Sequence, residues 1–211
     1  MLQDPVHLFK SLRNNWFTEK CGTLSFRLKD EVITGKWSDI EDVYKKDSMN
    51  VVKRTKLSYR SIHPSAIERQ KVSLMCDVLN EKTVAALRMD GCSDTAKFLE
   101  ICLRLWNIFN IKRTDTHIRL NDPNRMPFSN AADDRLVFMT DVAEGLSMMQ
   151  GGRSFSRNKS LTTETKEAFM KTIHGMVYLI RKMLLEDHQY VLPGVFQTDR
   201  LEGEFGIHVY R

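Results

Sequence analysis

A stripe of apolar side chains in residues 162–186 is the feature that most limits what this chain can fold into. The apolar residues recur every three or four positions, at Phe169, Ile173, Met176, Val177, Ile180, Met183 and Leu184. This spacing places them on one face of a helix, and Thr162 or Thr163 can cap its start. A helix of this length must bury such a face against other elements. The sequence therefore predicts a packed domain in which helices dominate.

A second helix is predicted near the start of the chain. Asp4 and Pro5 are suited to its N-cap and first position, because the carboxylate accepts free backbone N–H bonds and proline has no N–H to lose. Leu8, Leu12 and Trp16 follow at intervals of four residues and form its apolar face. We expect this helix to end near residue 17.

Four more helices are indicated along the chain. The capping-box pair Ser38 and Glu41 opens a short one, and Pro64 opens a long one that reaches about residue 89, with Asn80 as a possible break. Gly91 with Ser93 and Asp94 forms a turn and cap before the next. The expected ranges are 38–44, 64–89, 93–109 and 134–146, the last with the pair Asp133 and Asp134 as its cap.

The remaining segments are less regular. Leu24, Phe26 and Leu28 alternate with polar residues and suggest a short strand. Residues 45–56 and 113–130 are predicted as loops, 150–159 as a Gly/Ser/basic linker and 190–196 as an extended piece. Asp199 and Glu202 have capping-box spacing and open a predicted last helix. The fold class is therefore mainly α.

Composition excludes several classes of protein. A hydrophobic content of 42% argues against a disordered chain, and no apolar run is long enough to span a membrane. No apolar leader is visible in residues 1–10. The four cysteines form no CxxC pair, which favours reduced thiols in a reducing compartment. A net charge of +5 permits a nucleic-acid partner without requiring one.

Few residues suggest chemistry by pattern alone. The sequence has no GxxxxGK[ST] phosphate loop, no HExxH and no GxSxG. Asp4 and Glu202 are carboxylates at opposite ends of the chain, and each has a simpler explanation as a helix cap. Taken by themselves, these two residues predict no active site.

Two long motifs change this interpretation. Residues 4–16 (DPVHLFKSLRNNW) resemble the DPPHLxKxxRNN motif of P-element-type, THAP-associated transposases, and residues 190–206 resemble the YVLxGxFQTDxLExxFG motif of that family. Between them, Lys56-Leu57-Ser58 and the later Glu68-Arg69-Gln70-Lys71-Val72 are similar to its KLT…ERQxV region. Residues 162–172 resemble the helix that precedes the last motif. The resemblance spans essentially residues 4–211 in one order.

The resemblance implies an RNase H-like catalytic fold in which two Asp and one Glu hold two Mg²⁺ ions for DNA cleavage and strand transfer. Asp4 matches the second Asp and Glu202 the Glu, as catalytic residues and metal ligands. The family also has a helical insertion domain that binds GTP without a phosphate loop. Asp199 matches an acidic residue expected to read the guanine edge. Asn107 occupies a second guanine-contact position, where many relatives carry Asp.

The resemblance also suggests a domain organisation. Residues 1–20 would be a remnant of the RNase H-like domain, residues 21–160 the helical GTP-binding insertion, and residues 161–211 the RNase H-like segment with the catalytic Glu. The first catalytic Asp and the zinc-binding DNA-recognition domain would lie before residue 1, and the tail after Gly206 diverges. The chain is therefore expected to be a fragment, or an incomplete gene model.

Two functional hypotheses follow. The first is a fragment of a P-element-type DNA transposase, inactive alone, with transposon-end DNA, Mg²⁺ and GTP as partners in the full-length relative. That relative would be nuclear, would not enter a membrane, and could form a homo-oligomer. The alternative is a domesticated, non-catalytic module that binds a guanine nucleotide or a protein partner. A product without function is a third possibility.

Overall fold

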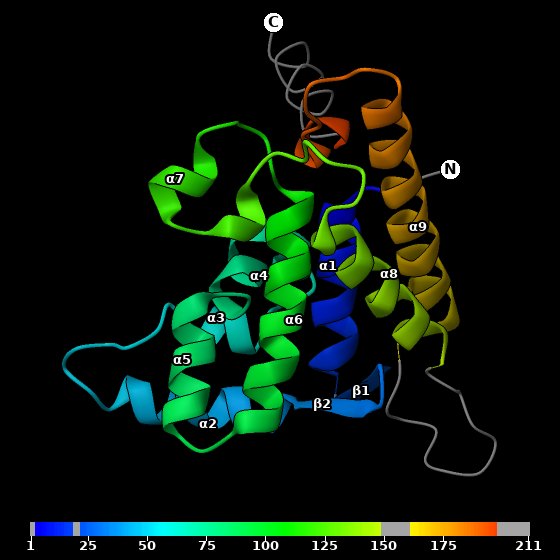
Figure 1. Ribbon diagram of the computed structural model, residues 1–211. Coiled ribbons are helices and arrows are strands. Elements are labelled where there is room, and N and C mark those ends of the chain that lie inside the picture. Colours follow the sequence, from blue (N-terminus) through cyan, green and yellow to red (C-terminus); the bar gives the residue numbers. More distant parts are fainter. Residues whose placement is uncertain (1–2, 19–21, 149–160, 198–211) are drawn as a thin grey trace, which may run out of the picture.

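The computed structural model describes residues 3–18, 22–148 and 161–197, and this part of the chain is mainly helical, as predicted (Figure 1). The elements, in order, are α1 (Pro5–Trp16), β1 (Thr23–Leu28), β2 (Glu31–Lys36), α2 (Trp37–Ser48), α3 (Tyr59–Ile62), η1 (Glu68–Gln70), α4 (Val72–Val78), α5 (Glu81–Met89), α6 (Ser93–Phe109), α7 (Thr116–Leu120), η2 (Pro123–Arg125), α8 (Asp134–Ser147), α9 (Thr163–Leu185) and η3 (Pro193–Phe196). No helix among these residues combines the length and the apolar character needed to cross a bilayer.

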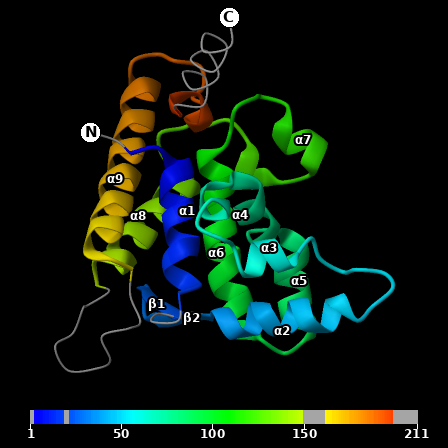
Figure 2. The ribbon, with the colours of Figure 1, turned by 180° about the vertical axis from the view of Figure 1, so that it is seen from behind.

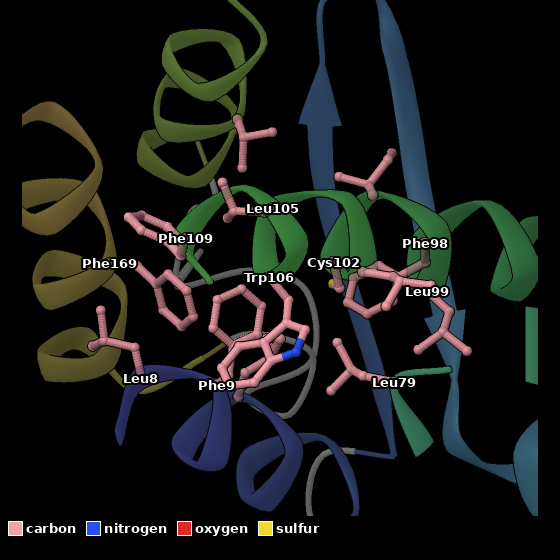
Figure 3. Close-up of a cluster of buried hydrophobic side chains, with 14 of the residues drawn as sticks. Leu8, Phe9, Leu79, Phe98, Leu99, Cys102, Leu105, Trp106, Phe109 and Phe169 are labelled. Carbon is pink, nitrogen blue, oxygen red and sulfur yellow. The ribbon is translucent and has the colours of Figure 1, made fainter. Parts of the chain in front are cut away.

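Helix α6 lies at the centre of the molecule, with α1, α8 and α9 on one side and α2 and α5 on the other (Figures 1 and 2). The aromatic ring of Phe9 on α1 meets Trp106 and Phe109 of α6 and Phe169 of α9 edge-on, with centroids 5.2, 6.5 and 5.3 Å away. Figure 3 shows these rings within one apolar cluster. The first and last described helices therefore share a core with the middle of the chain.

The predicted strand is confirmed as β1, which pairs with β2 in an antiparallel hairpin. Lys29 takes a positive φ of 54° in the turn between them. Gly35 of β2 lies against α6 and α1, because a Cβ there would come within 2.5 Å of the Phe98 ring. The indole nitrogen of Trp16 donates to the Gly35 carbonyl at 3.0 Å. The hairpin is thus fixed to both helices at a position without a side chain.

The single long helix predicted from Pro64 to residue 89 is wrong. A short helix, α3, lies before this segment; Ser58 caps it, and it ends at Ile62, before the His63–Pro64 step. Proline disfavours the helical conformation in the residue before it, which explains this end. Two separate helices, α4 and α5, follow the turn η1, and Asn80 caps α5 through Lys82 N. The break suggested at Asn80 is confirmed.

Some predicted caps are correct and others are not. Asp4, Asp133 and Thr162 each accept a backbone N–H at the start of a helix, as expected. The predicted capping box of Ser38 and Glu41 is wrong, because α2 begins directly after β2 at Trp37 and its N-cap, Lys36, makes no side-chain cap. Helix α6 starts at Ser93, and the side chain of its N-cap residue, Cys92, makes no capping hydrogen bond.

Two predicted irregular segments contain more structure than expected. Helix α2 continues to Ser48, inside the loop predicted for 45–56. The loop 113–130 contains α7 and η2. Phe128 forms an isolated antiparallel bridge with Val191, and the piece predicted as extended then turns into η3. The linker 150–159 and the last helix predicted from Asp199 lie outside the described residues.

Candidate functional site

Asp4 is the N-cap of α1. Its Oδ1 accepts a hydrogen bond from Val6 N at 2.8 Å, and its carbonyl accepts from His7 N and Leu8 N. The backbone N–H of the preceding residue, Gln3, donates to the hydroxyl of Thr172 on α9 at 3.1 Å. The carboxylate is partly exposed and sits where α1 meets α9. The structure therefore gives Asp4 the capping role that its sequence also suggests.

Asn107 is buried near the C-terminal end of α6, and both ends of its amide are engaged. Its side chain is only 3% exposed. The Nδ2 atom donates to Asp122 Oδ2 at 2.9 Å, and Oδ1 accepts from Arg125 Nη2 at 2.5 Å. An aspartate at this position would set its carboxylate against that of Asp122. The amide thus matches its present neighbours better than an acid would.

The neighbours of Asn107 form a connected polar cluster. Asp122 also accepts from Asn124 N at 3.0 Å and pairs with Arg125 Nε at 3.2 Å. Asn124 Oδ1 accepts in turn from Arg104 Nε at 3.0 Å, and the Arg104 guanidinium stacks on the Phe138 ring at 4.0 Å. Burial, and then the charge of Arg135, lower the pKa of Arg104 from its ordinary value. We call Arg104, Asn107, Asp122, Asn124 and Arg125 the α6 polar cluster.

Four members of the α6 polar cluster line an open cleft of about 510 Å³, namely Arg104, Asn107, Asp122 and Asn124. Lys97, Glu100, Leu28 and Phe138 are among the other residues that face it, so its walls carry both signs of charge together with apolar surface. A cleft with a few convergent polar groups among apolar ones is the usual form of a small-molecule site. The mixture of polar and apolar residues that line the cleft is therefore typical of a ligand site. The charges that line it are of both signs.

Arg135 holds the loop that carries Asp122 and Asn124. Its buried guanidinium donates to the carbonyls of Asn124 and Pro127 at 3.2 and 3.3 Å and also to that of Met126, and it pairs with Asp133 at 2.7 Å. Burial opposes ionisation of Asp133, but the hydrogen bonds from Arg135 outweigh it and lower the pKa of that carboxyl. The loop is thereby fixed to the start of α8.

Gln197 brings the end of the described chain to the same end of α6. The side chain is buried, and its Nε2 donates to Phe109 O at 3.0 Å and to Asn110 Oδ1 at 3.2 Å. Its Oε1 atom is buried and has no hydrogen-bond partner within residues 3–18, 22–148 and 161–197. Gly194 supports this contact, since its N–H donates to Ile111 O at 2.9 Å and a Cβ would collide with Lys112.

The predicted site residues are therefore placed as follows. Asp4 and Asn107 are described, whereas Asp199 and Glu202 lie outside the described residues. Phe109 links the two placed parts, because its ring contacts Phe9 of α1 and its carbonyl accepts from Gln197. Within the described residues, no group of three His, Cys, Asp or Glu side chains converges as a metal site would require.

Sequence reasoning misses most of the α6 polar cluster. The Asp122-Pro123 pair predicts only a turn, and the structure shows that this turn also presents its carboxylate to Asn107. Arg125, three residues after Asp122, donates hydrogen bonds to the side chains of Asp122 and Asn107. The available signal is an Asp-Pro turn that also carries Asn124 and Arg125, but its spacing does not define a contact to α6. Gln197 has no signal beyond its place in the last motif.

Comparison with known proteins gives a likeness of fold. No protein-family model matches the chain, and no curated protein matches it by sequence. A solved structure, the Drosophila P element transposase strand transfer complex, contains a chain that superposes with a TM-score of 0.76 over 97% of this chain, at 17% identity. The match covers 45% of that chain, so this protein spans less than half of its length. At this identity the likeness is one of fold.

Proposed function

We propose that this chain is part of a P-element-type DNA transposase and comprises a guanine-nucleotide-binding helical region with flanking segments of an RNase H-like domain. The observation that carries the proposal is the structural match over nearly the whole chain to the P element transposase in its strand transfer complex. The two terminal sequence motifs point to the same family. On this proposal the partner is transposon-end DNA, the setting is nuclear, and the active form could be a homo-oligomer.

The proposed guanine site lies at the C-terminal end of α6. Asp199 follows Gln197 by two residues, and Gln197 is hydrogen-bonded to Phe109 and Asn110. The resemblance implies that Asp199 supplies the carboxylate of this site. A carboxylate can accept from both N1–H and the N2 amino group of guanine, and adenine lacks both donors. The unpartnered Oε1 of Gln197 is a further buried acceptor beside the same helix end.

Binding would require an exchange of partners. The amide of Asn107 is occupied at both ends by Asp122 and Arg125, so a base must displace one of them to contact it. Arg125 is the easier to displace, because its side chain is 21% exposed and its stem is long. Once released, its guanidinium can pair with a phosphate oxygen. The α6 polar cluster would thus serve both ends of a nucleotide.

The proposed catalytic residues are Asp4 and Glu202. Only four residues separate Glu202 from Gln197, and Gln197 is linked through Phe109 to the helix that Asp4 caps. The partly exposed carboxylate of Asp4 fits a hard oxygen ligand for Mg²⁺, although Oδ1 already accepts from Val6 N. When bound, paired metal ions activate the attacking oxygen and stabilise the leaving one. A third carboxylate would have to come from outside this chain.

The guanine site is tested by nucleotide-dependent melting of the purified chain. GTP should raise the melting temperature and ATP should not, following the stabilisation expected for a ligand that binds only the folded state. Replacing Asn107 by Leu, or Gln197 by Leu, should reduce the GTP-induced shift by more than half. Asn50→Leu and Gln70→Leu are matched controls at exposed positions and should leave the shift intact.

Equal melting curves with GTP, ATP and no nucleotide would contradict the guanine site. A shift that is unchanged in both the Asn107 and Gln197 variants would place the nucleotide elsewhere. Because either substitution can lower the melting temperature itself, the quantity compared is the difference with and without GTP for each variant. GTP and its non-hydrolysable analogue should give the same difference.

A non-catalytic guanine-nucleotide- or partner-binding module is the second candidate. It is favoured by the ordinary capping geometry of Asp4, which needs no catalytic role to explain it. In a strand-cleavage assay on transposon-end DNA with Mg²⁺, only a positive result would distinguish the two. Neither candidate expects this chain to cut alone. Metal-dependent cleavage that Glu202→Gln abolishes would favour the catalytic assignment and reject the expected inactivity.

A further inference from the structure

Arg13 is a buried cation whose charge has no carboxylate beside it. Its side chain is 0% exposed at the contact between α1 and η1. Among the residues that the structure describes, its Nη2 donates to the carbonyl of Arg69 at 2.8 Å, while Nε and Nη1 are buried without partners. Two unused donors on a wholly buried guanidinium are costly, because each has lost its water.

A second guanidinium lies next to the first. Arg69 of η1 is exposed, and its guanidinium rests on the ring of Phe17 at 4.8 Å from the centroid. Burial, and then the charge of Arg69, lower the pKa of Arg13 to about 10. Two like charges brought together without a counter-ion repel each other. Within the described ranges, neither arginine forms an ion pair with a carboxylate.

The face of α1 that meets η1 is otherwise polar and basic. Lys10, Arg13, Asn14 and Phe17 recur at the spacing of one helical face, and Lys10 is also nearly buried. Asn14 Nδ2 makes only a long contact of 3.4 Å to the carbonyl that Arg13 uses. The surroundings therefore offer donors and positive charge, and Glu68, the carboxylate that η1 carries, is paired with Arg60.

We propose that Arg13, Arg69 and Asn14 form a binding site for an oxyanion of the phosphate class. A tetrahedral dianion can accept from two guanidinium groups at once, which a single carboxylate does less well. Arg69 is the entry residue, since it is exposed and its guanidinium rests on the ring of Phe17. The site is separate from the α6 polar cluster and does not depend on the proposed function.

Phosphate-dependent melting of the whole chain tests the site. Sodium phosphate at about a hundred times its dissociation constant should raise the melting temperature of the wild type by roughly 5–10 °C over sodium chloride of the same ionic strength. Arg13→Met should abolish this shift, and Arg69→Gln should at least halve it. Arg88→Gln, an exposed arginine on α5, is the matched control and should leave it unchanged.

The Arg13 variant also separates a ligand site from a structural role. If Arg13 is an anion ligand, its charge is unbalanced when no phosphate is bound. Arg13→Met should then melt no lower than the wild type in chloride, because the substitution removes a buried, unbalanced charge. A lower melting temperature in chloride, together with an undiminished phosphate shift, would overturn the proposal. Because Arg69 is exposed, Arg69→Gln should fold, and an undiminished shift in that variant would also overturn it.

A second arm identifies the source of the phosphate. Binding of labelled duplex DNA is measured by fluorescence anisotropy for the wild type, Arg69→Gln and Arg88→Gln. A weakening of about tenfold in Arg69→Gln alone, with the salt dependence reduced by about one phosphate contact, would assign the site to a nucleic-acid backbone. A phosphate shift with unchanged DNA affinity would assign it to free phosphate. Asn107→Leu should retain the phosphate shift, which keeps this result independent of the guanine site.

Discussion

Asp47 illustrates how one carboxylate can hold a surface loop. Its side chain is 2% exposed and accepts from Arg54 N at 2.7 Å, Thr55 N at 2.9 Å and Thr55 Oγ1 at 2.7 Å. These bonds close the loop of residues 49–53, which projects from the body of the protein. The side chains of Met49 and Val51 are almost fully exposed at its tip. The conformation of the loop is therefore fixed by the hydrogen bonds of Asp47 at its base, and the exposed side chains at its tip contribute little.

Replacing Asp47 by Asn should destabilise the protein by roughly 1–3 kcal/mol, because in either orientation the buried amide nitrogen would face a backbone N–H donor, that of Arg54 or that of Thr55. Urea unfolding at pH 7 measures the loss. Asp42→Asn, on the same helix but exposed and paired only with Lys45, is the control and should change stability by less than about 0.5 kcal/mol. Equal effects of the two substitutions would contradict this account of the loop.

The contribution of Asp47 should also depend on pH. Burial alone would raise its pKa, but the hydrogen bonds from Arg54 and Thr55 outweigh burial and hold the pKa below the ordinary 3.8. A carboxyl with a depressed folded pKa stabilises above its unfolded pKa and loses that effect as pH falls through the folded value. The advantage of the wild type over Asp47→Asn should thus be full at pH 6 and shrink below about pH 4. An advantage that grows on acidification would contradict the sign.

At the scale of elements, α8 depends on a close approach to the hairpin. A Cβ at Gly145 would lie 1.9 Å from the carbonyl oxygen of Arg27 in β1. Gly145→Ala should therefore destabilise by roughly 1–3 kcal/mol although alanine favours helices, because helix and strand must separate. Glu144→Ala, the exposed neighbour, should have little effect in the same thermal unfolding measurement. A stabilised Gly145→Ala protein would show that the contact yields easily.

The elements are predictable as far as local signals specify them. Apolar spacing, together with the caps at Asp4, Asp133 and Thr162, identifies helices in which the cap side chain accepts a backbone N–H of the first turn. Ser38 misleads because the start of α2 is set by the end of β2, which is a tertiary constraint. Pro64 misleads because its strongest effect is on the residue before it. Both errors concern boundaries that packing decides.

The site is less accessible from sequence than the fold. The motifs around Asp4 and Asp199 can be recognised, but the contacts of Asn107 with Asp122 and Arg125 join α6 to a loop whose path depends on Arg135. Arg13 stands out in the sequence only as part of a motif, since burial without a counter-ion has no sequence pattern. Contacts between segments that no local spacing relates are visible only after folding.

At the scale of the whole molecule, the described residues share one continuous core. Phe9 of α1, Phe109 of α6 and Phe169 of α9 belong to the same cluster, which crosses the domain boundaries expected at residues 20 and 160. The described part should therefore unfold in a single cooperative transition. Tryptophan fluorescence and far-UV circular dichroism should give the same midpoint in urea. Two separate midpoints would mean that the expected domains are independent, and the absence of any cooperative transition would favour a product without function.

The projecting loop has a practical consequence. Because Asp47 ties the backbone on its far side at Arg54 and Thr55, cutting the peptide chain between residues 49 and 53 would leave both new ends fastened to the same carboxylate. The two fragments would remain together, since their contacts are made elsewhere. The tip is thus a suitable place to insert a fluorescent label or an affinity tag without disturbing the rest of the protein.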